Sequence, residues 1–211
     1  DREVIGGPLM IQYADQGAHC TYIHVTQGRL EDPDATEEAK QAYLKDLLRQ
    51  NKEAAEKMGG DTIWLGYVSS DMPSTEEFAR RLETYFEDEN VDLVITHWRG
   101  SMHPRHINTY DAVTTAVKRL REKGSPIRLM YGETFEDLVG FIPQAYFTVN
   151  EDVYGRWQDA LKTYDVYRGE VNSFPYQPYY TTIGRVRQIE SNNSDRTAAY
   201  MYASLIENDL W

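Results

Sequence analysis

Three of the five histidines lie within ten residues, at His97, His103 and His106. They directly follow an apolar, β-branched run, Val91–Thr96, which predicts a strand. Neutral imidazole is the commonest metal ligand and the natural acid or base near pH 7. The H-x-x-H spacing with an intervening proline is moderately specific and favours a loop-to-helix junction, where both side chains can face one cavity. The segment therefore predicts a metal or acid–base site.

A zinc site of the catalytic type needs about three protein ligands and an open position. Because Cys20 is the only cysteine, a thiolate cluster is excluded, and histidine and carboxylate are the expected ligands. We expect Asp1 and Glu3, at the carboxyl end of a first strand, to supply the carboxylate ligands. The Gly6-Gly7 turn that follows is only a weak phosphate signal, because it lacks G-x-G-x-x-G and a P-loop lysine.

Hydrophobic periodicity predicts elements that would position these groups. The expected strands are Cys20–Thr26, Thr62–Tyr67, Val91–Thr96, Ile127–Tyr131 and Ala145–Val149. The expected helices are Pro8–Asp15, Thr36–Met58, Ser74–Glu87, Asn108–Lys123 and Val153–Val166. Such alternation implies right-handed βαβ units and a mostly parallel sheet covered on both faces. We predict a three-layer, Rossmann-like α/β fold that forms a single domain over residues 1–211.

Ligands bind outside the carboxyl ends of parallel strands, so the histidine segment should meet the ends of the other strands at one edge of the sheet. Near the end of the chain, Phe174–Tyr180 is aromatic and interrupted by prolines, which predicts irregular structure. These rings, with Trp98, are interpreted either as walls that stack on a sugar or as a plug at the end of the sheet. His19 and His24 are interpreted as structural, because one follows a turn glycine and the other lies within a strand.

The composition excludes several classes of protein. A hydrophobic content of 41% in 211 residues can form a core, which excludes global disorder. A net charge of −12 argues against nucleic acid and anionic membrane surfaces as partners. No apolar run approaches the roughly 20 residues that cross a bilayer. The single cysteine fits a reducing compartment, and we expect a cytoplasmic protein.

These motifs together resemble the PIG-L/LmbE-like family of zinc-dependent N-acetylglucosaminide deacetylases, over nearly all 211 residues. Residues 1–7 (DREVIGG) are similar to the second half of the family's H-P-D-D-x-E motif and its glycine turn. Residues 64–67 (WLGY) resemble its L-G-[YF] strand, and residues 96–106 resemble its T-H…H-P-D-H motif. The resemblance implies that a first strand, a histidine ligand and a general-base aspartate precede Asp1.

Carried over to this chain, the family pattern implies that Asp1 and His106 bind Zn²⁺ or another divalent metal. It implies that His103 stabilises the tetrahedral intermediate and protonates the leaving amine. Less specific matches suggest three substrate contacts: His97, Arg49 and Asp71. The implied substrate is a small amino-sugar glycoside, and a homo-oligomeric assembly is left open.

One departure from the family bears directly on chemistry. The family's H-P-D-H is H-P-R-H here, so Arg105 replaces an aspartate that would hydrogen-bond the catalytic histidine. Losing that partner should lower the basicity and the positional order of His103. The leading hypothesis is metal-assisted hydrolysis of an N-acetyl group. The alternatives are a catalytically silent sugar-binding member of the same fold and, by fold analogy alone, a nucleotide-binding protein.

Overall fold

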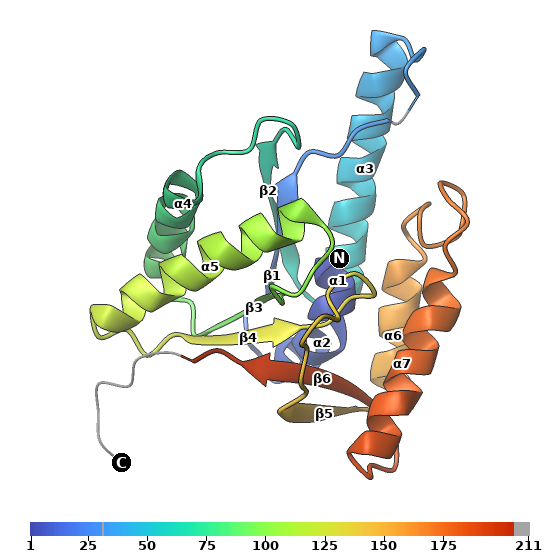
Figure 1. The fold of residues 1–211 in the computed structure, drawn as a ribbon. Helices are drawn as coiled ribbons and strands as arrows, with labels where there is room; N and C mark the ends of the chain where they lie inside the picture. Colours follow the sequence, from blue (N-terminus) through green and yellow to red (C-terminus); the bar gives the residue numbers. More distant parts are fainter. Residues whose placement is uncertain (31, 205–211) are drawn as a thin grey trace. The chain divides into compact units, whose positions relative to one another are not determined.

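The computed structural model describes residues 1–30 and 32–204, in which helices and strands alternate along most of the chain (Figure 1). The mixed α/β class predicted from the sequence is confirmed. The chain divides into two compact units. Unit 1 comprises Asp1, Met72–Tyr146 and the described residues from Ala199 on, and unit 2 comprises Arg2–Asp71 and Phe147–Ala198.

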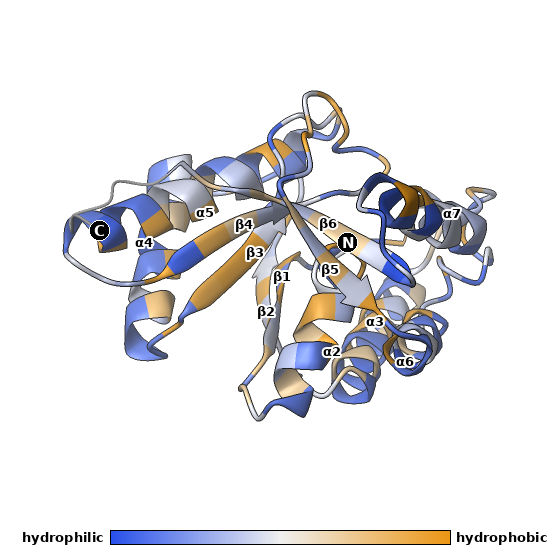
Figure 2. Cartoon of the chain, turned by 90° about the horizontal axis from the view of Figure 1, so that it is seen from below, coloured by the Kyte–Doolittle hydropathy of each residue, from blue (hydrophilic) through white to orange (hydrophobic). Residues whose placement is uncertain are grey.

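Unit 1 carries two strand–helix pairs. Its elements are α4 (Thr75–Asp88), β3 (Leu93–His97), α5 (Pro104–Glu122) and β4 (Arg128–Gly132). β3 and β4 pair in parallel, with His97 opposite Gly132, and the middle of both strands is hydrophobic (Figure 2). α4 and α5 pack on each other through buried residues that include Phe78, Leu82 and Val117. His97 is the last residue of β3, so the paired strands and the helices beside them hold its backbone in place.

The sheet of four strands has the order β3-β4-β6-β5, with β5 at Ala145–Val149 and β6 at Arg196–Tyr202. β6 runs antiparallel to β4, with Met130 opposite Tyr202. The expected parallel pairing thus holds for β3 with β4 but not for β4 with β6. β6 was not predicted from the sequence, because its seven residues (RTAAYMY) lack clear alternation, although the turn-forming residues 191–195 (SNNSD) precede it.

Unit 2 contains the other parallel pair of strands, β1 (Thr21–Thr26) and β2 (Asp61–Tyr67), with Ile23 opposite Ile63. Its helices are α1 (Arg2–Ile5), α2 (Gly7–Asp15), α3 (Glu37–Lys57), α6 (Glu151–Leu161) and α7 (Tyr176–Glu190). Ile11, Ala54 and Ala160 are fully buried in its core. The Cys20 thiol is also buried there and donates a hydrogen bond to the carbonyl oxygen of Met10 at 3.5 Å.

Two expected segments have a different structure. The start of the chain was expected to be the end of a strand, but residues Arg2–Ile5 form the short helix α1. Phe174–Tyr180 was expected to be irregular, but α7 begins inside it at Tyr176. Pro178 falls in the first turn of α7, where a missing N–H group costs no intrahelical hydrogen bond. Proline there is compatible with a helix start.

α5 begins at Pro104, four residues before the expected Asn108. Proline is favoured at the first helical position because its φ angle is already helical. The Nδ1 atom of His103 accepts a hydrogen bond from the backbone N–H of Arg105 at 3.3 Å and so caps the helix. This early start places His106 within the first helical turn. None of the described helices is both long and apolar enough to cross a membrane.

Candidate metal centre

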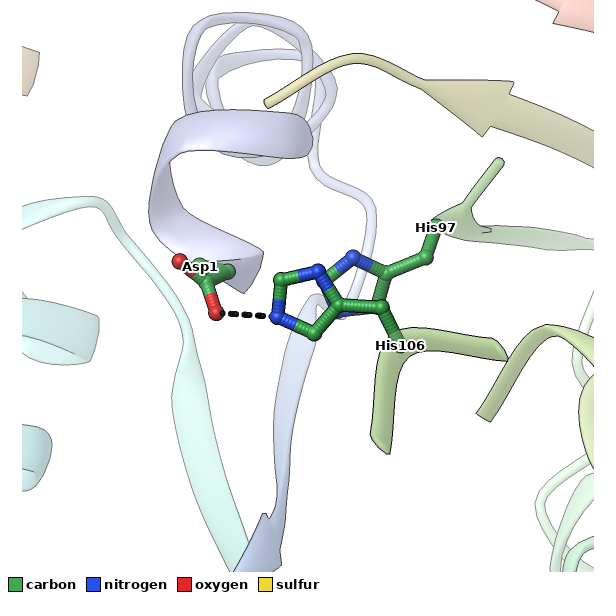
Figure 3. A group of neighbouring side chains, drawn as sticks. All are labelled: Asp1, His97 and His106. Carbon is green, nitrogen blue, oxygen red and sulfur yellow. Dashed lines mark hydrogen bonds and ion pairs between the residues drawn. The ribbon is translucent and has the colours of Figure 1, made fainter. Parts of the chain in front are cut away.

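Three potential metal ligands of unit 1 converge, although Asp1 and His106 are 105 positions apart in sequence. Asp1 precedes α1, His97 ends β3, and His106 lies in the first turn of α5. One ligand atom from each residue lies within 4.8 Å of the other two. Figure 3 shows the two imidazoles lying one over the other, with the Asp1 carboxylate directed at His106. Nε2 of His106 is 3.0 Å from Oδ2 of Asp1.

The imidazoles of this site form a stack with His106 in the middle. The ring centroids of His97 and His106 are 3.9 Å apart, and those of His103 and His106 are 4.6 Å apart. The interplanar angle is 23° in both pairs. His106 is 6% exposed, and burial lowers the pKa of His97 to about 4 despite its hydrogen bond with Asp137. A neutral imidazole is the form that binds a metal ion.

Sequence reasoning missed Asp137, which contacts two of these rings. Its Oδ2 lies 2.7 Å from Nδ1 of His97, and its Oδ1 lies 2.8 Å from Nδ1 of His106. Burial raises the pKa of this carboxyl, but the hydrogen bonds from His106 and His97 outweigh burial and hold the pKa well below its usual range. The available signal was its position: Glu136 and Asp137 follow β4, so the strand-end rule that selected His97 applies to them also.

The donors of the site fit a divalent cation. The contact with Asp137 requires a hydrogen on Nδ1 of His106, whereas a hydrogen bond to Asp1 requires one on Nε2. A neutral imidazole has only one N–H, so the ring can donate to both carboxylates only in its protonated form. A cation held between Nε2 and the Asp1 carboxylate would take the place of that second proton. Two imidazoles and a carboxylate are also a usual zinc donor set.

The loop that follows β3 and the loop that follows β4 are joined by backbone hydrogen bonds. The backbone N–H of Met102 donates to the carbonyl oxygen of Glu136 at 3.2 Å, and that of Val139 donates to the carbonyl oxygen of Gly100 at 3.0 Å. A Cβ atom at Gly100 would lie 1.7 Å from the carbonyl oxygen of Val139, so only glycine fits there. The Glu136 carboxylate lies 3.7 Å from Nε2 of His106 and adds a third acidic group near the centre, after Asp1 and Asp137.

Arg105 alters the environment of His103. Its Nη2 lies 2.9 Å from Nε2 of His103, so a fixed positive charge faces the ring. The pKa of His103 is lowered to about 4 by burial first, then by His106 and by Arg105. The sequence expectation that losing the aspartate lowers the basicity of His103 agrees in direction with this pKa.

The other predicted substrate residues, Arg49 and Asp71, lie in unit 2. Arg49 pairs with Asp46 and Glu53 along its own helix, at 2.8 and 2.9 Å. Asp71 is exposed in the turn after β2. Their substrate contacts stay predictions.

Glu3, the other expected carboxylate, is buried in unit 2. Its Oε1 accepts a hydrogen bond from the Tyr164 hydroxyl at 2.6 Å and pairs with Nη2 of Arg2 at 2.8 Å. Glu3 is not a member of the group of potential metal ligands. Its contacts are those of a structural carboxylate.

Solved structures show the same fold at low sequence identity. A pseudoaglycone deacetylase for an antimicrobial reagent matches with a TM-score of 0.71 and 16% identity, covering 99% of this chain and 95% of its own. N,N'-diacetylchitobiose deacetylase from Pyrococcus horikoshii matches with a TM-score of 0.74 and 16% identity, covering 96% and 79%. The 4-carboxy-2-hydroxymuconate hydratase from Pseudomonas putida matches with a TM-score of 0.77 and 14% identity, covering 99% and 94%.

No curated protein sequence matches the chain. The sequence does match the family of GlcNAc-PI de-N-acetylase, PIG-L, over residues 1–117. The matched segment covers more than half of the chain and includes Asp1, His97, His103 and His106. The chain therefore belongs to the PIG-L family, as its motifs indicated.

Proposed function

We propose that this protein is a zinc-dependent N-deacetylase that hydrolyses the acetyl amide of an N-acetylglucosamine-type glycoside. The products would be acetate and the free amino sugar. One observation carries the proposal: Asp1, His97 and His106 place three potential ligand atoms within 4.8 Å of one another. Membership in a family described by a de-N-acetylase supports the reaction type. Deacetylases among the solved structures of the same fold support it further.

Asp1, His97 and His106 would hold the cation. A bound divalent cation would polarise the acetyl carbonyl and acidify the attacking water. The His103 imidazole, stacked on His106, is the group proposed to protonate the leaving amine. With a pKa of about 4, this ring is neutral at pH 7 and must first accept a proton before it can donate one. The permanent charge of Arg105 stands beside it.

The fold alone does not select this reaction, because the same fold occurs in a hydratase and in deacetylases. The experiment must therefore measure metal content and product together. We expect the purified protein to bind about one zinc ion per chain and to release acetate from an N-acetylglucosamine glycoside. We expect His106→Ala to lose both properties, and His19→Ala, whose side chain is exposed, to keep both.

Full acetate release by metal-stripped His106→Ala protein would overturn the proposal. Zinc binding without acetate release, together with hydration of an unsaturated carboxylate, would replace the deacetylase with a hydratase.

A catalytically silent sugar-binding protein is the second candidate, and Arg105 is the observation that favours it. The guanidinium faces the ring that should work as a proton donor and lowers its pKa. Binding of N-acetylglucosamine glycosides by protein that holds no zinc and releases no acetate would select this function. Calorimetry with the glycoside, before and after zinc addition, separates the two candidates.

A further inference from the structure

Asp137 is the buried acid of unit 1 that neither the family motifs nor the proposed reaction uses. It is fully buried, and each of its carboxylate oxygens meets the Nδ1 atom of a different imidazole. The two imidazoles belong to different elements, because His97 ends β3 and His106 lies in the first turn of α5. One side chain thus ties a strand end to a helix start.

Both hydrogen bonds have the same direction. A carboxylate oxygen accepts, so the Nδ1 atoms of His97 and His106 both donate. When Nδ1 of a neutral imidazole carries the hydrogen, its Nε2 atom keeps a free lone pair. Nε2 of His106 is also the atom that lies 3.0 Å from the Asp1 carboxylate. The contacts with Asp137 thus leave the Nε2 lone pair of each ring available to a cation.

The local backbone fixes Asp137 in this position. The carbonyl oxygen of Thr134 accepts a hydrogen bond from the backbone N–H of Asp137 at 3.1 Å. The Thr134 hydroxyl accepts one from the backbone N–H of Glu136 at 3.2 Å, and Thr134 is itself fully buried. A carboxylate held on such a turn can orient the rings without large loss of side-chain entropy.

We propose that Asp137 is a positioning residue of the metal centre, which fixes His97 and His106 with Nδ1 protonated so that both Nε2 atoms can bind one divalent cation. This inference rests on the proposed function, because it assigns a role within the same site. Partners of this kind orient metal-binding histidines and raise their basicity, and their loss typically weakens metal binding 10- to 100-fold.

Asp137→Asn is the sharpest test because it preserves shape and removes one acceptor. The amide NH₂ group cannot accept, so the imidazole facing it must turn away or move its hydrogen to Nε2. We expect the zinc dissociation constant, measured by competition with a chelator, to rise roughly 10- to 100-fold. We also expect the visible spectrum of the cobalt-substituted protein to change. The matched control is Asp111→Asn, which changes an acid of α5 that pairs with Arg99. It should leave the zinc dissociation constant and the cobalt spectrum unchanged.

A second measurement needs no variant and keeps the proposal testable if Asp137→Asn fails to fold. Nitrogen-15 chemical shifts of the metal-free wild-type protein report which ring nitrogens carry hydrogen. A hydrogen on Nδ1 of both His97 and His106 supports the inference, and its absence from either ring overturns it. Unchanged zinc affinity in Asp137→Asn also overturns it and leaves the proposed function intact. Failure of the wild-type protein to bind zinc overturns the proposed function and the metal role of Asp137 together.

Discussion

The guanidinium of Arg105 points at the ring of His103, with Nη2 of the arginine 2.9 Å from Nε2 of the histidine. Both residues lie at the start of α5, and the Arg105 backbone also donates to Nδ1 of the same ring. Each ring nitrogen of His103 therefore faces a donor from one arginine. Protonation of this imidazole is opposed from two sides, which agrees with its lowered pKa.

Arg105→Asp should raise the pKa of His103 above about 4, because it removes one of the charges that lower it, whereas burial and His106 continue to act. A carboxylate would replace a positive charge and favour the imidazolium. Acetate release at neutral pH should increase by about tenfold or more, since a well-tuned general acid contributes about 10²–10⁴. Proton NMR titration of His103 and initial rates check both effects. Arg99→Asp, an exposed arginine of the same unit, should change neither.

Gly100→Ala should disrupt the two bonded loops of unit 1. The added Cβ would lie 1.7 Å from the carbonyl oxygen of Val139, so the backbone must move. Overpacking of this kind costs about 1–3 kcal/mol, and we expect a lower free energy of unfolding and weaker zinc binding. The contrasting variant is Gly155→Ala on α6, where no atom outside the adjacent helix backbone lies within 4 Å of the new Cβ. It should stabilise the protein by about 0.5–1 kcal/mol. Urea denaturation of both variants should show a lower free energy of unfolding for Gly100→Ala and a higher one for Gly155→Ala.

The free energy of unfolding should fall as the pH is lowered below about 6.5. Burial, and then Arg2, lowers the pKa of His24 to about 2, so below pH 6.5 the unfolded chain binds a proton that the folded chain excludes. The slope from this residue approaches about 1.4 kcal/mol per pH unit until the folded protein also titrates. His24→Gln should flatten the slope between pH 6 and 5, and His19→Gln should preserve it. A slope that is equal in all three proteins would contradict this prediction.

Glu3 adds a second acid-sensitive interaction at lower pH. Burial raises its pKa, but the charge of Arg2 and the hydrogen bond from Tyr164 contribute to lowering it to about 2. The ionised Glu3 carboxylate therefore stabilises the folded protein above about pH 4.5, and this stabilisation is lost as the pH falls toward 2. Tyr164→Phe removes the 2.6 Å hydrogen bond to Oε1 and should destabilise the protein by about 1.5–3 kcal/mol at pH 7. In Glu3→Gln protein, Tyr164→Phe should lower the free energy of unfolding by less than it does in the wild-type background. Equal losses in the two backgrounds would contradict a direct interaction between Tyr164 and Glu3.

Local sequence signals were sufficient for most elements of the fold. Thr36, Ser74 and Asn150 cap α3, α4 and α6, and each accepts a hydrogen bond from the third residue after it. Such caps act over one turn, so they are readable from sequence. β6 and α7 were missed because their formation depends on strand pairing and helix packing rather than on a strong local pattern.

The candidate site was only partly predictable for the same reason. His97 and His106 were found because a strand end and the H-x-x-H spacing are local signals. Asp137 was not found, since its partners are 40 and 31 positions away and the hydrogen bonds exist only after folding. His97 was expected to contact substrate, but the structure groups it with Asp1 and His106 as a potential ligand. Spacing in a sequence does not show which nitrogen of a ring will face which neighbour.

The buried thiol of Cys20 gives unit 2 an internal reporter. It is the only sulfhydryl in the chain, and its side chain is shielded within a hydrogen-bonded core. Burial also raises its pKa, so little of it is thiolate at neutral pH. A maleimide dye should therefore label the native protein slowly, at a rate set by transient opening around β1. Labelling kinetics would measure local unfolding of unit 2 without any engineered probe.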